Sequence, residues 1–312
     1  MHVWLRADAS TRFGVGHVMR TLALAEHAKG RGLEVRLIWA GDVDASPLAA
    51  RFGVEARPAE DGDWIASIDP GDVVWFDGYH FSEADFERAR DAGARVAAID
   101  DQPRSTFGID LLVVPENIPG WTPSSDAKVL MGPDFALVRN EFKERRRIRS
   151  SSPDRLLVTF GGSDTKGLGR FVAGQAAELK RFGEIVLLEG PATPRSTDGK
   201  FSIIRNPRSV ADIFDNASAA ISAAGSTTWE LLCMGVPTCV LEIAPNQRYL
   251  YATVVGADAA LGGGRAPLDA AKVRETLSKL GELDGERLSR NAMSIVDGLG
   301  PMRVTDAIFD LV

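Results

Sequence analysis

The sequence predicts an α/β protein built from two doubly wound domains, each a parallel sheet with helices on both faces. Short apolar runs rich in β-branched residues alternate with helical patterns along the 312 residues. A charged, serine-rich segment interrupts this alternation near the middle of the chain. The length accommodates two domains of about 150 residues each.

The first half contains five apolar runs that we interpret as strands, at residues 3–8, 34–41, 72–78, 95–100 and 110–116. Helical patterns separate them. The first helix is expected from His17 to Arg31, because its apolar residues recur at helical spacing: Leu22, Leu24, Ala25 and Ala28.

The second half repeats the pattern, with strands expected at residues 156–162, 184–190, 201–207, 218–225 and 237–244. We predict an N-terminal domain at 1–145, a C-terminal domain at 153–312 and a linker at 143–153. The basic run from Lys143 to Arg149 is expected to be a solvated part of this linker. Ligands of such sheets collect at the carboxyl ends of the strands, so the cleft between the domains is the expected site.

Composition and charge exclude several classes of protein. The net charge of -7 and the isoelectric point of about 5.3 disfavour binding to nucleic acid or to an anionic membrane. Cys233 and Cys239 lack the partners of a zinc site and are expected to be buried thiols. The start of the chain lacks the features of a signal peptide, and no apolar run approaches the roughly 20 residues of a spanning helix. A cytoplasmic protein without membrane insertion is expected.

The turn Gly14-Val15-Gly16-His17 lies between the first strand and the first helix. It is similar to the start of a dinucleotide fingerprint, but Met19 replaces the third glycine, which disfavours a nicotinamide or flavin enzyme. Gly14 and Gly16 would still let an anionic ligand approach the backbone. We expect the helix N-terminus to lower the pKa of His17, so that a neutral imidazole can accept a proton. The alternative is that His17 only satisfies a local backbone group.

Two turns in the second half are suited to phosphate groups. Gly161-Gly162-Ser163 and Gly225-Ser226-Thr227 each end a strand and begin a helix. Glu230 follows one helical turn later and could accept hydrogen bonds from both hydroxyls of a ribose. The alternative is that Thr227 caps the helix and Glu230 completes a capping box.

Further polar residues follow other strands. Asn246 and Gln247 offer amide groups that suit an N-acetyl or hydroxyl-bearing sugar, although surface residues of this kind are as often only solvated. Asp77, Tyr79 and His80 follow one strand, and Asp100 and Asp101 follow another. We favour hydrogen-bonding roles for these residues over a metal site, for which no third ligand is evident.

Motifs along nearly the whole chain resemble the UDP-2,4-diacetamido-2,4,6-trideoxy-β-L-altropyranose hydrolase family of pseudaminic acid biosynthesis. In order, they are RADASTRFGVGHVMRTLALA, FDGY, IDD, MGPDFALVRNEF, FGGSD, AAGSTTWELLCMGVP, NQ and DGLGPMRV. The opening motif is the most specific of them. The resemblance implies the glycosyltransferase-B fold, with two Rossmann-like domains facing a cleft.

The resemblance also implies roles for individual residues. His17 would be the base that activates water against the anomeric carbon. UDP would bind the C-terminal domain through Glu230 and both phosphate turns: Gly161, Gly162, Ser163, Gly225, Ser226 and Thr227. The sugar side would include Asp8, Gly14, Gly16, Arg20, Tyr79, Asn246 and Gln247.

The sequence thus predicts a UDP-sugar hydrolase that needs no cofactor and no metal and acts as a monomer. UDP is a good leaving group, so catalysis mainly requires stabilisation of the departing diphosphate and positioning of water. A glycosyltransferase that uses the same donor is the first alternative, because the fold alone does not decide which acceptor reaches the anomeric carbon. A nucleotide-sugar binding subunit without turnover is the second.

Overall fold

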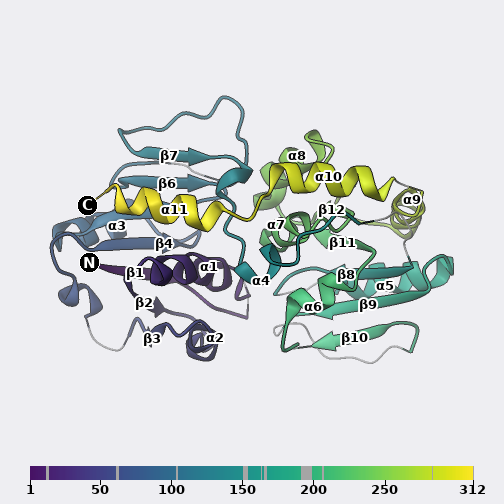
Figure 1. The fold of residues 1–312 in the computed structure, drawn as a ribbon, viewed down its shortest axis with the longest axis horizontal. Helices are drawn as coiled ribbons and strands as arrows, with labels where there is room; N and C mark the ends of the chain where they lie inside the picture. The colour runs from purple at the N-terminus through teal and green to yellow at the C-terminus, as the bar shows by residue number, and fades with distance from the viewer. Residues whose placement is uncertain are drawn as a thin grey trace. The chain divides into compact units, whose positions relative to one another are not determined.

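The computed structural model describes residues 1–11, 14–60, 63–102, 105–149, 154–162, 164, 167–190, 199–205, 207–282 and 284–311. The chain forms two compact units. The first comprises Met1–Asn140 together with Gly298–Val312, and the second comprises Glu141–Asp297. Each unit contains one parallel sheet with helices packed on it (Figure 1).

The first unit contains a seven-stranded parallel sheet with the order β3-β2-β1-β4-β5-β6-β7. Its strands are β1 (His2–Ala7), β2 (Glu34–Trp39), β3 (Glu55–Pro58), β4 (Val73–Asp77), β5 (Arg95–Ile99), β6 (Leu111–Val114) and β7 (Lys128–Met131). The five predicted strands are confirmed. β3 and β7 were not predicted, because these short edge strands are only half-buried and lack a continuous apolar run.

The helices of the first unit are α1 (Gly16–Gly30), α2 (Ser46–Arg51), α3 (Glu83–Asp91) and α11 (Gly300–Phe309), with short 3₁₀ segments η1 (Trp64–Ser67) and η2 (Pro133–Phe135). α1 and α11 pack against each other and share a core with one face of the sheet. Leu5 and Trp75 lie in that core beside Ile308 of α11. The predicted boundary placed the C-terminal residues in the second domain, whereas they complete the core of the first unit.

The second unit contains a six-stranded parallel sheet with the order β10-β9-β8-β11-β12-β13. Its strands are β8 (Arg155–Thr159), β9 (Glu184–Glu189), β10 (Ser202–Arg205), β11 (Ala219–Ala223), β12 (Thr238–Glu242) and β13 (Leu261–Arg265). β13 was not predicted, because its sequence Leu-Gly-Gly-Gly-Arg lacks strand propensity. A Cβ atom on Gly263 would lie 2.7 Å from Leu241 and 2.8 Å from Cys239, so close packing favours glycine there.

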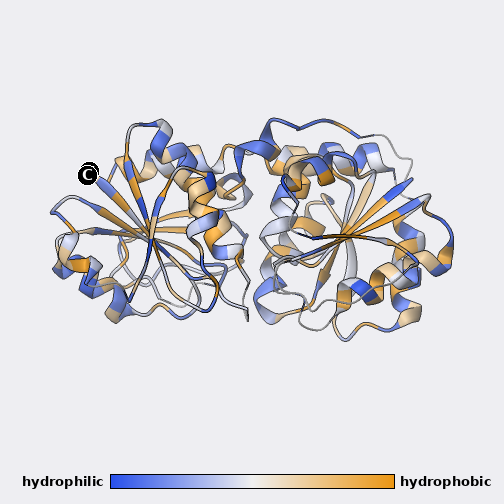
Figure 2. Cartoon of the chain, turned by 90° about the horizontal axis from the view of Figure 1, so that it is seen from below, coloured by the Kyte–Doolittle hydropathy of each residue, from blue (hydrophilic) through white to orange (hydrophobic). Residues whose placement is uncertain are grey.

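The helices of the second unit are α5 (Leu168–Leu179), α6 (Val210–Asp215), α7 (Ser226–Cys233), α8 (Arg248–Gly256), α9 (Ala270–Leu280) and α10 (Gly285–Ile295), and η3 (Pro245–Gln247) is a short 3₁₀ segment. α4 (Asn140–Lys143) lies where the chain passes from the first unit to the second. Figure 2 shows hydrophobic residues concentrated along the strands of each unit, as expected for sheets covered by helices.

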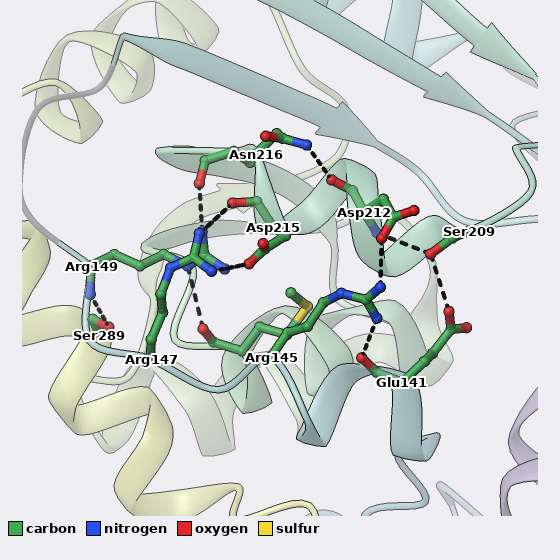
Figure 3. A network of polar contacts seen from close by, with 11 residues as sticks. Glu141, Arg145, Arg147, Arg149, Ser209, Asp212, Asp215, Asn216 and Ser289 are labelled. Atoms are coloured by element: carbon green, nitrogen blue, oxygen red, sulfur yellow. Dashed lines mark hydrogen bonds and ion pairs between the residues drawn. The ribbon is translucent and has the colours of Figure 1, made fainter.

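The basic run from Lys143 to Arg149 is not a solvated linker, contrary to the prediction. Arg145 pairs with Asp212 at 2.5 Å, and Arg147 pairs with Asp215 (Figure 3). Arg149 is 7% exposed and donates from Nη1 to the carbonyl oxygens of Asp215 at 2.8 Å and Ala217 at 3.1 Å.

Burial lowers the pKa of Arg149 to about 10, and the neighbouring charge of Arg147 acts in the same direction. The segment up to Arg149 is therefore a packed part of the second unit. Residues 150–153 of the predicted linker lie outside the described residues.

Two other expectations concern the whole chain. Cys233 and Cys239 are buried free thiols, as predicted, and burial raises the pKa of both. Within the described ranges, no helix combines the length and apolar character needed to span a membrane.

Candidate functional site

The strand order of the first unit reverses between β1 and β4. From β1 the chain continues outward through β2 and β3, and from β4 it continues in the opposite direction through β5, β6 and β7. In open α/β sheets, ligands bind outside the carboxyl ends of the strands at such a switch point. The glycine-histidine turn follows β1, and Asp77, Tyr79 and His80 lie at the end of β4, so the predicted residues lie at this point.

The turn before α1 has a backbone that requires glycine. Ser10 and Gly14 form an isolated antiparallel bridge, with Gly14 N donating to the carbonyl of Ser10 at 2.7 Å. Gly14 has φ of +75°, in the left-handed region that side chains with a Cβ disfavour. Gly16 begins α1, so His17 occupies the first turn of the helix, as predicted.

His17 is half-buried and its ring meets the ring of Tyr79 edge-on, with centroids 4.8 Å apart and an interplanar angle of 76°. Removal from water lowers the pKa of His17. The negative charge of Asp77 opposes this shift, and the positive charge of Arg20 adds to it. The predicted direction is confirmed, and desolvation is its main cause. The imidazole is therefore neutral at physiological pH.

Behind His17, Arg20 is held by two aspartates. Its Nε and Nη2 each donate to Asp77 at 2.7 Å, and its Nη1 donates to Asp101 at 2.7 Å. The phenol of Tyr79 donates to the other oxygen of Asp101 at 2.7 Å, and Thr21 donates to Asp77 at 2.9 Å. These bonds confirm hydrogen-bonding roles for Asp77, Tyr79 and Asp101.

The network fixes the ionisation of its members. Burial disfavours charge on Asp101, but Arg20 and the Tyr79 hydroxyl outweigh it and lower the pKa of this carboxyl. The pKa of Arg20 is raised well above its ordinary value, because Asp101 and Asp77 outweigh the burial. Three of the five N–H donors of Arg20 are directed at these carboxylates, which gives Arg20 a positioning role, and its contact with substrate stays a prediction.

Glu116 is a buried carboxyl of this edge that sequence reasoning missed. It follows β6, is 2% exposed, and its Oε2 has no hydrogen-bond partner among the described residues. Burial and the charge of Asp101 raise its pKa well above the ordinary 4.5, so Glu116 is a neutral acid at moderate pH. The available signal was its place as the last residue of the run 110–116, at the carboxyl end of a predicted strand.

Asp8 connects the ends of neighbouring strands. Its Oδ1 accepts a hydrogen bond from the backbone N–H of Ala40 at 3.0 Å and pairs with Arg6, and its Oδ2 lies 3.0 Å from Nε2 of His80. Asp8 lies at the predicted edge of the sheet, and these contacts give it a structural role in joining β1, β2 and β4.

The second unit has its own switch point, between β8 and β11. The turn with Gly161 and Gly162 follows β8, and the turn with Gly225, Ser226 and Thr227 follows β11. Because β8 and β11 are neighbouring parallel strands, both predicted phosphate turns lie at adjacent strand ends.

The start of α7 is uncapped by side chains. Its N-cap is Gly225, with no side-chain hydrogen bond, and Ser226 and Thr227 are the first helical residues. The alternative in which Thr227 caps the helix is therefore wrong. A Cβ atom on Gly225 would meet nothing within 4 Å, so the backbone borders open space. Glu230 is half-buried and, at i+4 and i+3 from Ser226 and Thr227, lies on their face of the helix.

The turn after β8 is organised by Asp164. Its Oδ1 accepts from the N–H of Leu168 at 2.9 Å and its Oδ2 accepts from the N–H of Gly169 at 2.6 Å, at the start of α5. Gly161 has φ of +79°, and a Cβ there would meet nothing within 4 Å. Gly161 and Gly162 are half-buried. Ser163 lies outside the described residues.

Asn246 and Gln247 follow β12 within η3, next to the β11 turn in the sheet order. Oε1 of Gln247 accepts from the N–H of Ile243 at 2.9 Å, so its carbonyl holds the loop. Both residues are half-buried. The amide nitrogen of Gln247, which takes no part in that bond, is suited to a ligand oxygen.

One group of described residues has ligand atoms close enough for a metal ion. These atoms, from His2, Asp69 and Asp72, lie within 4.8 Å of one another. His2 and Asp72 stand at the amino ends of β1 and β4, opposite the edge described above. Asp72 accepts from His2 N at 2.7 Å and from Trp4 Nε1 at 2.9 Å, which gives it a structural role.

Comparisons with known proteins agree with the motifs. No family model matches the chain. It is 26% identical to the spore coat polysaccharide biosynthesis protein SpsG of Bacillus subtilis, over all of this chain and 98% of that protein. It is 25% identical to the uncharacterized protein MJ1062 of Methanocaldococcus jannaschii, over 80% of this chain and 57% of that protein.

A third relative carries the name of the resembled activity. Over 79% of this chain and 45% of the relative, the chain is 24% identical to the pseudaminic acid cytidylyltransferase and UDP-2,4-diacetamido-2,4,6-trideoxy-β-L-altropyranose hydrolase of Helicobacter pylori. The chain thus spans about half the length of two of these curated relatives.

Solved structures show the fold. Acinetobacter baumannii MurG matches with a TM-score of 0.64 and 15% identity, over 99% of this chain and all of MurG. Medicago truncatula UGT71G1, solved with UDP-glucose, matches with a TM-score of 0.63 and 12% identity, over 98% of each chain.

One relative is named for spore coat polysaccharide biosynthesis and another for a UDP-sugar hydrolase, and the similar structures have the glycosyltransferase-B fold. Sequence and fold therefore confirm the resemblance that the motifs indicate: this chain has two Rossmann-like domains and is similar to the UDP-diacetamido-trideoxyaltrose hydrolases of pseudaminic acid biosynthesis.

Proposed function

We propose that this protein hydrolyses a UDP-linked diacetamido-trideoxyhexose at the anomeric carbon–oxygen bond, releasing the free sugar and UDP for nonulosonic acid biosynthesis. The observation that carries the proposal is His17, a histidine of lowered pKa at the switch point of the first sheet. The similarity to the Helicobacter pylori hydrolase supports the substrate class.

In the proposed reaction, neutral His17 removes a proton from water while the water oxygen bonds to the anomeric carbon. The bond from that carbon to the phosphate oxygen breaks, and UDP leaves with the bonding electrons. Arg20, Asp77 and Asp101 hold Tyr79 against the His17 ring, which orients the base. Such general-base assistance contributes roughly 10²–10⁴-fold to the rate.

In this proposal, UDP binds to the second unit. The two phosphate turns lie at adjacent strand ends, and the open start of α7 offers N–H groups and a dipole to the diphosphate. Glu230, one turn later on the same helix face, would accept the ribose hydroxyls. In this proposal, His17 of the first unit and the phosphate turns of the second unit act on the same substrate.

The test is incubation with UDP-2,4-diacetamido-2,4,6-trideoxyaltrose without an acceptor, in ¹⁸O-water. Release of UDP with label in the sugar is the expected result, and His17→Asn should lower turnover at least about a hundredfold while UDP affinity stays constant. Label in UDP would refute attack at the anomeric carbon. Release only after an acceptor is added would identify a glycosyltransferase, and tight binding without turnover would identify a binding subunit.

A further inference from the structure

A small cavity lies beside Tyr79, on the face of the first sheet opposite α1. Its volume is about 250 Å³. Besides Tyr79, three phenylalanines line it, namely Phe76 of β4, Phe81 of the following loop and Phe86 of α3. Their rings pack edge to face, with 5.1 Å from Phe76 to each of the other two.

The floor of the cavity is apolar. It includes the buried residues Ala98 of β5 and Leu112 of β6, which are 3% and 0% exposed. An occupant of this space would bury apolar surface against the strands of the sheet. The cavity is smaller than the 300–1,000 Å³ typical of drug-sized ligands, which suits a substituent rather than a whole sugar nucleotide.

The rim of the cavity excludes anions. The carboxyl-bearing residues Glu83 and Asp100 line it together with the hydroxyl of Ser105, which donates to Glu83 at 2.6 Å. Phosphate or carboxylate would be repelled there. A neutral group with a polar linkage and a short apolar end matches both parts of the cavity.

Tyr79 connects this cavity to the candidate site. Its ring contacts His17 and it also lines the cavity, so one side chain separates the two. We propose that this cavity, here termed the acyl pocket, binds the N-acyl group of the substrate sugar and sets the length of acyl chain that the protein accepts. The proposal rests on the proposed function for the identity of the sugar.

The first test needs no sugar nucleotide. N-methylacetamide, titrated into protein with labelled methyl groups, should shift the Leu112 and Ile109 methyl signals, because both residues line the acyl pocket. Ala98→Leu fills the pocket and should abolish these shifts. Ala94→Leu is the matched control, since it adds the same atoms to a cavity of about 350 Å³ that shares no lining residue with the acyl pocket, and it should leave the shifts unchanged.

The second test measures chain-length preference by calorimetry with the UDP-diacetamido sugar and its propionyl and butyryl analogues. Phe81→Ala enlarges the pocket and should favour butyryl over acetyl by about fourfold for each methylene buried. UDP affinity should not change in any variant.

The outcomes separate the two proposals. Absence of the Leu112 and Ile109 shifts, or their persistence in Ala98→Leu, would overturn the acyl pocket. Unchanged chain preference in a folded Phe81→Ala protein would overturn it as well. A parent protein that binds UDP but none of the donors would contradict the proposed function instead, and the N-methylacetamide titration would then decide the pocket alone.

Discussion

At the scale of single residues, His17 is the group whose protonation state matters most. Its pKa is lowered chiefly by desolvation, and Asp77 and Asp101 partly oppose this effect. In an NMR titration its midpoint should lie below 6.5. Asp101→Asn removes a negative charge that raises the pKa, so the midpoint should fall further.

A midpoint of His17 above 6.5, or an upward shift in the variant, would contradict the assigned electrostatics. If His17 is the base, hydrolysis should also decline as the pH falls through this midpoint, because only the neutral ring accepts a proton.

Glu116 gives a second prediction at this scale, which concerns stability. Its pKa is raised in the folded state, so the native protein retains a proton that the unfolded chain loses as the pH rises above about 4.5. The stabilisation that Glu116 contributes is therefore complete below about pH 4.5. It is lost as the pH rises toward the pKa that Glu116 has in the folded protein. The loss is at most about 1.4 kcal/mol per pH unit.

Glu116→Gln removes this titration while keeping the shape of the side chain. In urea unfolding between pH 4.5 and 7.5, the variant should gain stability relative to the parent as the pH rises. A difference that stays constant over this range would show that Glu116 does not retain its proton in the folded protein.

At the scale of elements, the turn before α1 depends on one backbone conformation. Gly14 has φ of +75° and is buried, so alanine there would be strained. Gly14→Ala should reduce the free energy of unfolding by about 1 kcal/mol or more, measured by urea unfolding.

Gly30 provides the control within the same helix. It is the last residue of α1, and a Cβ there would meet nothing within 4 Å. Gly30→Ala should be neutral or stabilise by up to about 1 kcal/mol, because alanine reduces the entropy of the unfolded chain. Equal effects of the two substitutions would show that the backbone conformation of Gly14 is not what the turn requires.

At the scale of the whole molecule, the last helix joins the first unit although the chain reaches it only after completing the second. Val304 and Ile308 of α11 are 0% exposed and lie in the core that includes Leu22 of α1. Ile308→Ala should cost about 2–5 kcal/mol, and the loss should appear in the first unit.

Hydrogen exchange measured by mass spectrometry locates this effect. Peptides from residues 1–140 should lose protection in Ile308→Ala, while those from 154–297 should not. Leu277→Ala, which truncates a fully buried residue of α9, should give the reverse pattern. Loss of protection confined to the second unit in Ile308→Ala would contradict the division of the chain.

The sequence by itself determined the features that depend on local patterns. The central strands of both sheets are continuous apolar runs because both of their faces are buried, and the turns around Gly14, Gly161 and Gly225 are placed by where those runs end. The motifs of the N-terminal turn likewise indicated the family resemblance. The edge strands β3, β7 and β13 were missed, since half-buried or glycine-rich strands lack this pattern.

Tertiary structure alone decided which distant residues meet. Arg20 is held by Asp77 and Asp101, which come from strands that only the sheet order brings beside it. The basic run became a packed segment because Asp215 and the carbonyl of Ala217 face Arg149, and α11 joined the first unit because its apolar face completes that core. Such pairings depend on contacts between residues far apart in the chain, which a local pattern does not encode.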